Sequence, residues 1–225
     1  MITYLLIFGA FMLAGWLISY GFKSRFGKYS LIPMKHGITG ENIAETMLIE
    51  NGIKDVRVRL VEGELTDHYD PSTKTINLSR KVYFGNHIAA VAVSAHECGH
   101  ALQHANAYSW LNMRSALIPV MKITSNWIQW ILLAGILLIN IFPQLLLFGI
   151  ILFASATLFS LITLPVEINS SHRALVWLAS SGITNAKTHV HASDALKWAA
   201  YTYLMAALGS MASLLYYFII YAGRK

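Results

Sequence analysis

Residues 117–165 read LIPVMKITSNWIQWILLAGILLINIFPQLLLFGIILFASATLFSLITLP, and Lys122 is the only charged residue among them. One helix needs only about 20 apolar residues to cross the hydrocarbon core of a bilayer, so this stretch is too long for a single crossing. Residues 140–144 (NIFPQ) interrupt it, and Pro143 can end or begin a helix there. The sequence therefore predicts a transmembrane helical hairpin over residues 117–166 with a very short turn.

Two further uncharged segments, residues 2–22 and 198–221, are each long enough to cross a bilayer. Charged residues make up only 12% of the 225 residues, whereas an average soluble domain carries about a quarter. The first segment is followed, not preceded, by basic residues, which is typical of a retained anchor rather than of a cleaved signal peptide. We therefore expect an α-helical integral membrane protein with about four transmembrane helices.

The basic residues indicate how these helices are oriented. Eleven of the seventeen Lys and Arg residues fall within residues 23–116, and the positive-inside rule places such a segment in the cytoplasm. Four crossings would put residues 167–197 on the same side and both termini outside, and only Arg224 and Lys225 count against this orientation. The net charge of +6 is then a topology signal, and because the chain has no nucleic-acid motif we expect no nucleic acid partner.

Residues 23–116 are long enough for one small water-facing domain. The pattern of apolar residues predicts a helix over about 40–51 and strands at 56–61 and 75–78. We expect the strands to form a small antiparallel sheet. A second helix over about 86–105 makes the domain α+β.

The predicted helix over 86–105 carries the HExxH pattern His96-Glu97-Cys98-Gly99-His100. Four residues advance a helix by about 400°, so both imidazoles project from one face and can share a metal ion. Glu97 is placed to reach a water molecule bound to that metal. The apolar residues 89–93 before the motif favour a buried site over two histidines on a solvated helix surface.

A catalytic zinc site uses three protein ligands and keeps a fourth position open. Beyond Glu97 the only acidic residues are Glu167 and Asp194, and Glu167 stands directly after the predicted hairpin. We therefore predict one Zn²⁺ per chain, held by two imidazoles and this carboxylate: His96, His100 and Glu167. The alternative is an interfacial glutamate that pairs with Arg173 or Lys197.

Four stretches of the chain resemble, in order, the YugP-type membrane zinc metallopeptidases: residues 66–71 (TDHYDP), 77–79 (NLS), 95–104 (AHECGHALQH) and 164–174 (LPVEINSSHRA). The resemblance covers nearly the whole chain. It implies a neutral zinc metallopeptidase of the bacterial cell (cytoplasmic) membrane, distantly similar to HtpX-like proteases, with a zincin-like catalytic domain and with Glu97 catalytic. Many glutamate-ligand zinc proteases keep an aspartate three or four residues beyond the third ligand, where this chain has Ser170 and Ser171.

The same motifs supply candidates for stabilising the negative charge that develops on the scissile carbonyl oxygen. His68 and Tyr69 are the catalytic candidates favoured beside the glutamate base, and His172 and Arg173 are the others. Because Arg173 lies about 600° of helix beyond the third ligand, we expect it to pair with an acid elsewhere. For Asp67, turn formation and a role in supporting the metal ligands are both open.

These observations predict a zinc-dependent metallopeptidase that cleaves peptide or protein substrates, membrane proteins among them, at the cytoplasmic face of the lipid bilayer. A catalytically silent, zinc-containing membrane scaffold or partner subunit is the alternative. An intramembrane protease is disfavoured because residues 86–105 are too polar at both ends to span. A transporter is disfavoured because Lys122 is the only charge in the hairpin.

Two remaining features receive structural interpretations. His189 and His191 are expected in an interfacial loop before the last span, with a second metal site as the alternative. Cys98 is expected to take part in helix packing. The predicted organisation is, in chain order, a transmembrane anchor (1–22), the zincin-like catalytic domain (23–116), the transmembrane hairpin (117–166), a helix with the third zinc ligand and a connecting loop (167–197), and a C-terminal transmembrane helix (198–225).

Overall fold

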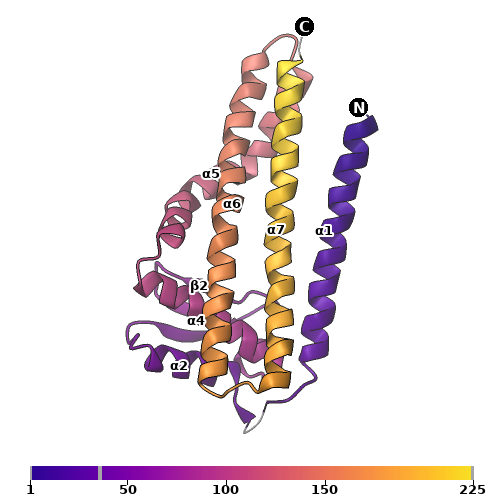
Figure 1. Ribbon diagram of the computed structural model, residues 1–225. Helices are drawn as coiled ribbons and strands as arrows, with labels where there is room; N and C mark the ends of the chain where they lie inside the picture. Colours follow the sequence, from indigo (N-terminus) through magenta and orange to yellow (C-terminus); the bar gives the residue numbers. More distant parts are fainter. Residues whose placement is uncertain (1, 35–36, 224–225) are drawn as a thin grey trace.

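The computed structural model describes residues 2–34 and 37–223, apart from the side chains of residues 2–8. This described part is mostly helical, and three of its helices are long and apolar enough to cross a membrane: α5 (Ser109–Leu137), α6 (Pro143–Ser180) and α7 (Ala186–Ala222). α6 and α7 run side by side, and α1 (Ile2–Tyr29) lies along the other side of α7 (Figure 1). The predicted first crossing, residues 1–22, falls on α1, and its first residue and the side chains before Gly9 lie outside the described residues.

A single helix, α6, carries both the second arm of the predicted hairpin and Glu167. Pro143 is its first residue, a position at which the missing backbone N–H is tolerated. At about 1.5 Å per residue, its 38 residues measure about 57 Å, nearly twice the hydrocarbon thickness of a bilayer. The boundary expected between residues 166 and 167 therefore falls inside one continuous helix, which must extend beyond one face of the membrane.

α7 begins earlier than expected. Asn185 caps the helix by accepting hydrogen bonds from the backbone N–H groups of the first turn, and the Thr188 side chain completes a capping box. The loop expected around His189 and His191 is therefore wrong, since both residues lie in the first turns of α7. α7, like α6, is long enough to link the membrane-spanning region to the domain below it.

The small sheet has three strands, β1 (Arg57–Val61), β2 (His68–Asp70) and β3 (Thr75–Ser79), in the order β1-β3-β2. β2 pairs with β3 in the antiparallel sense, as expected, but β1 pairs with β3 in parallel. The chain reverses direction twice between β1 and β3, once before β2 and once after it, so β3 runs in the direction of β1. The expected antiparallel sheet is thus corrected to a mixed sheet.

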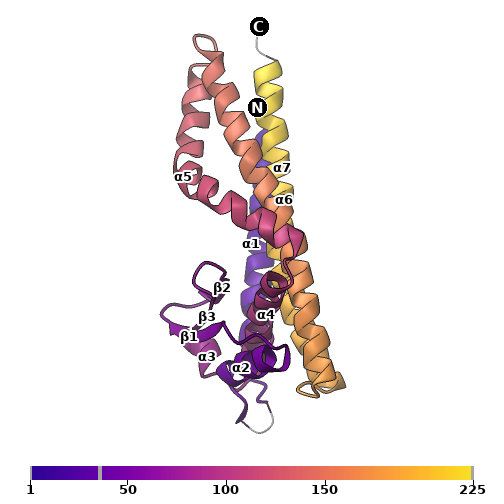
Figure 2. The ribbon, with the colours of Figure 1, turned by 90° about the vertical axis from the view of Figure 1, so that its left-hand side faces the viewer.

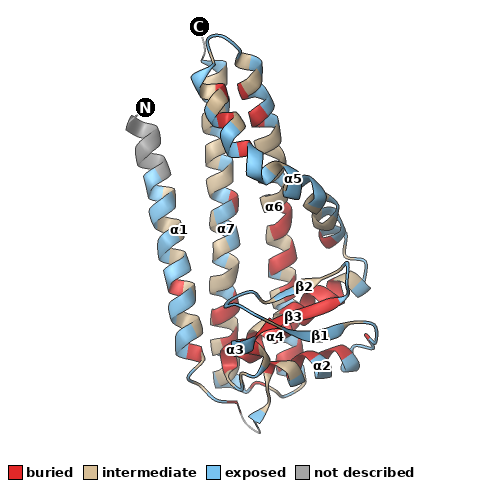
Figure 3. Ribbon diagram, turned by 180° about the vertical axis from the view of Figure 1, so that it is seen from behind, coloured by how far each residue is buried: buried red, intermediate tan, exposed pale blue. Residues whose placement is uncertain are grey.

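The domain beside the sheet contains α2 (Gly40–Glu50), the short α3 (Arg80–Tyr83) and α4 (Ile88–Ala105). α4 lies at the centre, against α2, the sheet and the lower parts of α6 and α7, and most of its residues are buried (Figure 3). At Gly99 the α4 backbone meets α6, since a Cβ there would lie 2.4 Å from Ser170 Oγ. This close approach sets the distance between the two helices that carry the candidate site.

Candidate metal centre

The two histidines of the HExxH pattern lie one turn apart on α4, as their spacing predicts. Their rings meet edge to face, with centroids 4.8 Å apart, and His100 is buried. α4 owes its fixed position to the apolar residues before the motif, which belong to the hydrophobic core. The helix therefore presents both imidazoles from a rigid element rather than from a loop.

Glu167 on α6 completes the cluster. Its Oε2 lies 3.2 Å from His96 Nε2 and 3.6 Å from His100 Nε2, and its side chain is only 3% exposed. One ligand atom from each residue falls within 4.8 Å of the other two. Two imidazole nitrogens and one carboxylate oxygen are the donor set of catalytic zinc sites with an open fourth position, so the residues fit a zinc ion.

The other ring nitrogen of each histidine also has a partner. His96 Nδ1 lies 3.0 Å from Ser171 Oγ, and His100 Nδ1 lies 3.0 Å from Gln103 Oε1. The fully buried Gln103 in turn donates to the Val166 carbonyl oxygen (2.8 Å), in the turn before Glu167. Such partners fix the ring orientation and leave each Nε2 free to face a metal ion. Ser171 thus stands where related sites use an aspartate.

Glu97, the residue between the two histidines, is buried and directed into the same region. Burial raises its pKa to about 7, with the negative charges of Glu167 and Asp67 adding to the shift, and His96 and the backbone N–H of Tyr69 lower it. A carboxyl group with a pKa near 7 can both accept and return a proton. Next to it, the Cys98 thiol is fully buried and burial raises its pKa, which leaves it the expected packing role.

A cavity of about 190 Å³ opens onto His96, Glu97 and Glu167. Asp67 and Leu65 line it from the loop before β2, and further residues come from α1 and α7, namely Phe22, Phe26, Ala195, Leu196, Ala199, Thr202 and Tyr203. The walls are thus mostly apolar around a polar floor. This is the usual composition of a ligand site, and the cavity gives access to two of the three candidate ligands, His96 and Glu167.

The structure does not bring the side chains of His68 and Tyr69 to this cavity. The His68 ring contacts the Thr66 carbonyl oxygen (2.7 Å) and the Asn77 amide (3.2 Å), and it is exposed. The Tyr69 hydroxyl lies 2.7 Å from His104 Nδ1. Neither residue is among the described lining of the cavity, so their predicted catalytic roles gain no support from these contacts.

The other two candidates from the family motifs also have different surroundings. His172 is exposed and lines a separate groove between α6 and α7. Arg173 Nε donates to Asn169 Oδ1 (2.8 Å), so its partner is an amide and not the acid expected for it. Asp67, left open between a turn and a supporting role, accepts from the Ser79 backbone N–H (2.7 Å) and lines the cavity.

Sequence patterns do not identify two residues that lie close to Glu167 in the structure. Arg114 Nη1 lies 3.4 Å from Glu167 Oε1, and Tyr203 lines the same cavity as Glu167. In the sequence, Arg114 is only one of the basic residues that set the topology, and Tyr203 is only part of an apolar span. No local pattern marks either of them, because each comes from a helix with no motif.

Comparison with known proteins gives a family for this geometry. No solved structure matches the chain. The protein named "Putative membrane protease YugP" from Bacillus subtilis (strain 168) is 42% identical to it over 199 residues, which cover 88% of each chain. Residues 4–222 match the family described as "Putative neutral zinc metallopeptidase". With its HExxH pattern, its cluster of two imidazoles and a carboxylate, and this match over nearly its whole length, the chain belongs to the neutral zinc metallopeptidase family.

Proposed function

We propose that this protein is a membrane-embedded zinc endopeptidase whose zincin-like domain binds one Zn²⁺ through His96, His100 and Glu167. The observation that carries the proposal is the convergence of these three ligand atoms within 4.8 Å, with Glu97 lining the same cavity as His96 and Glu167. Family membership supports zinc as the ion. The membrane protease from Bacillus subtilis supports the placement of the chain in a membrane.

The residues divide the chemistry of peptide hydrolysis among them. Zinc, when bound, lowers the pKa of a water molecule and polarises the scissile carbonyl group. Glu97 is placed to take a proton from the attacking water and to pass it to the leaving amine. Because water is the nucleophile, no covalent bond to the protein forms. Tyr203 lines the cavity next to Glu167, and we assign to its hydroxyl the hydrogen bond to the developing oxyanion.

We place the site at the cytoplasmic face of a four-span protein in the cell membrane. α1 supplies the fourth crossing, because residues 2–22 carry no charge and α1 lies along α7. The metal cluster joins α4 to the lower third of α6, next to the domain that holds eleven of the seventeen Lys and Arg residues. The site then sits in the cytoplasm close to the membrane surface.

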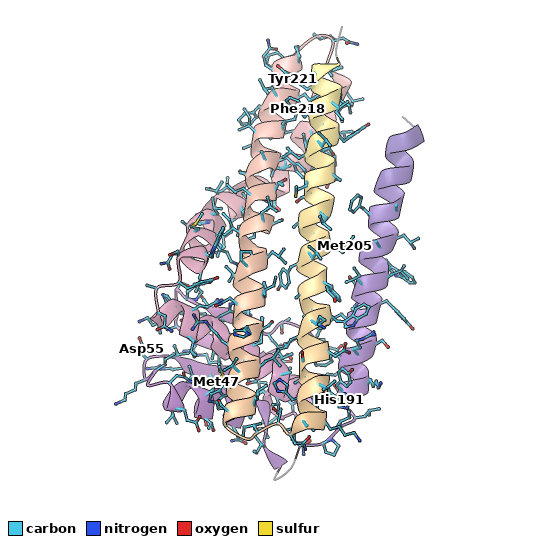
Figure 4. The ribbon with its side chains drawn as sticks, in the orientation of Figure 1. Met47, Asp55, His191, Met205, Phe218 and Tyr221 are labelled. Atoms are coloured by element: carbon cyan, nitrogen blue, oxygen red, sulfur yellow. The ribbon has the colours of Figure 1, made fainter. Side chains whose placement is uncertain are left out.

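The substrates we propose are peptides and proteins, membrane proteins among them. α1 and α7 are joined at their lower ends, where Arg25 Nε lies 3.0 Å from Asp194 Oδ2, and they separate towards the upper end (Figure 1). An apolar groove runs between them, with Met205 of α7 in its wall (Figure 4). Thr202 lines both this groove and the metal cavity, which supports access to the site from the bilayer.

The decisive experiment replaces the proposed base. The purified Glu97→Gln variant should bind about one zinc per chain but cleave no peptide of a quenched-fluorescent library that the wild type cleaves. Glu62→Gln, an exposed glutamate of the same domain, is the matched control and should leave cleavage unchanged. Cleavage retained by Glu97→Gln would refute the assigned chemistry, and a wild type that binds zinc but cleaves nothing would identify a silent scaffold.

A further inference from the structure

The two oxygens of the Glu167 carboxylate have different partners. Oε2 faces the Nε2 atoms of both histidines, at 3.2 Å and 3.6 Å. Oε1 faces Arg114, whose Nη1 lies 3.4 Å away. A carboxylate can bind zinc through one oxygen or through both oxygens. Only binding through one oxygen gives one ligand atom from each of the three side chains and leaves the fourth position open. The contact with Arg114 therefore bears directly on how Glu167 can bind.

Arg114 lies in the first part of α5, and this helix is bent. Pro119 lies inside this helix, where proline removes a backbone hydrogen bond and kinks the chain. Figure 2 shows that α5 first crosses α6 obliquely and then turns to run alongside it. Arg114 belongs to the part before Pro119, so the segment that crosses α6 delivers a cation to the metal centre from outside the HExxH motif.

The position of the Arg114 guanidinium is unfavourable for one of its nitrogen atoms. Its Nε is buried and is the one buried side-chain nitrogen or oxygen without a hydrogen-bond partner among the described residues. Nearly all buried polar groups in folded proteins are paired, and an Arg–carboxylate pair formed for stability alone usually uses two parallel hydrogen bonds. Here Nη1 lies close to Glu167, while Nε has no hydrogen-bond partner. This arrangement indicates that Arg114 is placed for its effect on Glu167.

We propose that Arg114 is a positioning residue that holds Oε1 of Glu167 and so leaves Oε2 as a single ligand oxygen for zinc. This inference rests on the proposed ligand set. Without the Arg114 cation, the Glu167 carboxylate can rotate and bind zinc through both oxygens. Its negative charge is then no longer balanced by a nearby guanidinium. Zinc then binds more weakly and with a different coordination geometry.

The test compares three variants of the full-length chain in lipid nanodiscs. Arg114→Gln removes the cation, and Arg114→Lys keeps a charge but lacks the planar fork of the guanidinium. Lys122→Gln is the matched control, because Lys122 is an exposed basic residue of the same helix with no role in the site. Zinc affinity is measured by competition with a chelator, and the visible spectrum of the Co²⁺-substituted protein reports the coordination geometry.

Arg114→Gln should bind zinc about 10- to 100-fold more weakly, the usual effect of losing a residue that supports a ligand, and should alter the Co²⁺ spectrum. Arg114→Lys should recover part of the affinity, and Lys122→Gln should match the wild type. A role of Arg114 limited to packing α5 on α6 would instead lower the unfolding temperature of the zinc-free protein and leave affinity and spectrum unchanged.

Zinc affinity of Arg114→Gln within about twofold of the wild type, with the same Co²⁺ spectrum, would overturn the inference. If Arg114→Gln fails to fold, Arg114→Lys decides: an altered spectrum supports the inference, and an unaltered spectrum with wild-type affinity overturns it. A wild-type protein that binds no zinc would refute the proposed function itself, so the two failures are distinguishable.

Discussion

The lower and upper parts of α6 lie in different surroundings. In the lower part, Glu167, Ser170 and Ser171 are engaged with α4 through hydrogen bonds and a close backbone contact at Gly99. In the upper part the core reduces to a small cluster of Ile128, Leu132, Leu146 and Ile150, and large apolar side chains cover the outside. Phe218 on α7 is one of these, with 56% of its surface exposed (Figure 4).

The two parts of α6 differ because lipid and water favour different side chains on a protein surface. Apolar side chains exposed over such an area are unfavourable in water and are matched by lipid, which offers no hydrophobic drive to pack helices together. The lower part buries an apolar core and pairs most of its buried polar groups, as a domain that faces water does. Paired substitutions, one in each part, can separate the chemistry of the metal centre from the anchoring in the membrane.

The largest expected effect comes from the third ligand. Glu167→Gln should reduce zinc affinity by more than the about 10- to 100-fold typical of a supporting residue, because a ligand atom itself is lost. Thr157→Val, two to three turns up the same helix and also buried, should leave zinc content at about one per chain. Metal analysis after dialysis against a chelator distinguishes them, and a Glu167→Gln variant that retains its zinc would show that the carboxylate is not a ligand.

A pair of glycines probes the packing of the two parts. A Cβ at Gly99 would lie 2.4 Å from Ser170 Oγ, and a Cβ at Gly135 would lie 2.6 Å from Leu146 Cα. Overpacking of this kind destabilises a protein by about 1–3 kcal/mol, so both alanine variants should unfold at lower temperature. Only Gly99→Ala should also lose zinc affinity, since α4 and α6 carry the ligands.

Gly209→Ala is the control for this pair, because nothing lies within 4 Å of a Cβ at that position. Thermal unfolding in nanodiscs and chelator competition give the two readouts. Equal zinc affinity in the Gly99 and Gly135 variants would mean that the α4–α6 contact does not set the spacing of the ligands.

Two tyrosines on α7 test the assigned oxyanion donor. Tyr203→Phe should lower kcat by about 10²-fold with little change in KM, because the hydrogen bond it removes strengthens in the transition state. Tyr217→Phe, in the upper part where its ring packs edge to face on Phe153, should change neither constant. A Tyr203→Phe variant with wild-type kcat would remove Tyr203 from the mechanism.

The smallest effect is expected at the serine beside His96. Ser171→Ala removes the partner of Nδ1 and should weaken zinc binding by about 10-fold, the lower end of the range for such supporting groups. Ser155→Ala, on the same helix in the upper part, breaks only a bond to the Leu152 carbonyl oxygen and should have no effect on zinc. Chelator competition would contradict this assignment if both variants bound zinc as tightly as the wild type.

Local patterns predicted the parts of this protein that depend on short-range geometry. The four-residue spacing of His96 and His100 specifies two side chains on one helix face, and the structure places them so. Glu167 could be selected because few acidic residues follow the motif, and its Oε2 indeed lies within 3.6 Å of both histidines. The catalytic roles predicted for His68 and Tyr69 remain untested predictions.

Other features depend on which elements meet, and no local pattern encodes that. The parallel pairing of β1 with β3 follows from two chain reversals whose combined outcome the alternation of apolar residues does not show. The same holds for Ser171, which occupies the place of an expected aspartate, and for Gln103, which bridges α4 to α6. Each becomes meaningful only once the distance between α4 and α6 is known.

The sequence by itself determined that the chain enters a membrane and carries an HExxH pattern, because hydropathy over some 20 residues and spacing along one helix are local properties. The tertiary structure decided that α6 passes from the apolar region to the site without a break, and that α5 and α7 bring Arg114 and Tyr203 to Glu167. Contacts between distant segments arise from packing and burial of the whole chain, so only the folded protein reveals them.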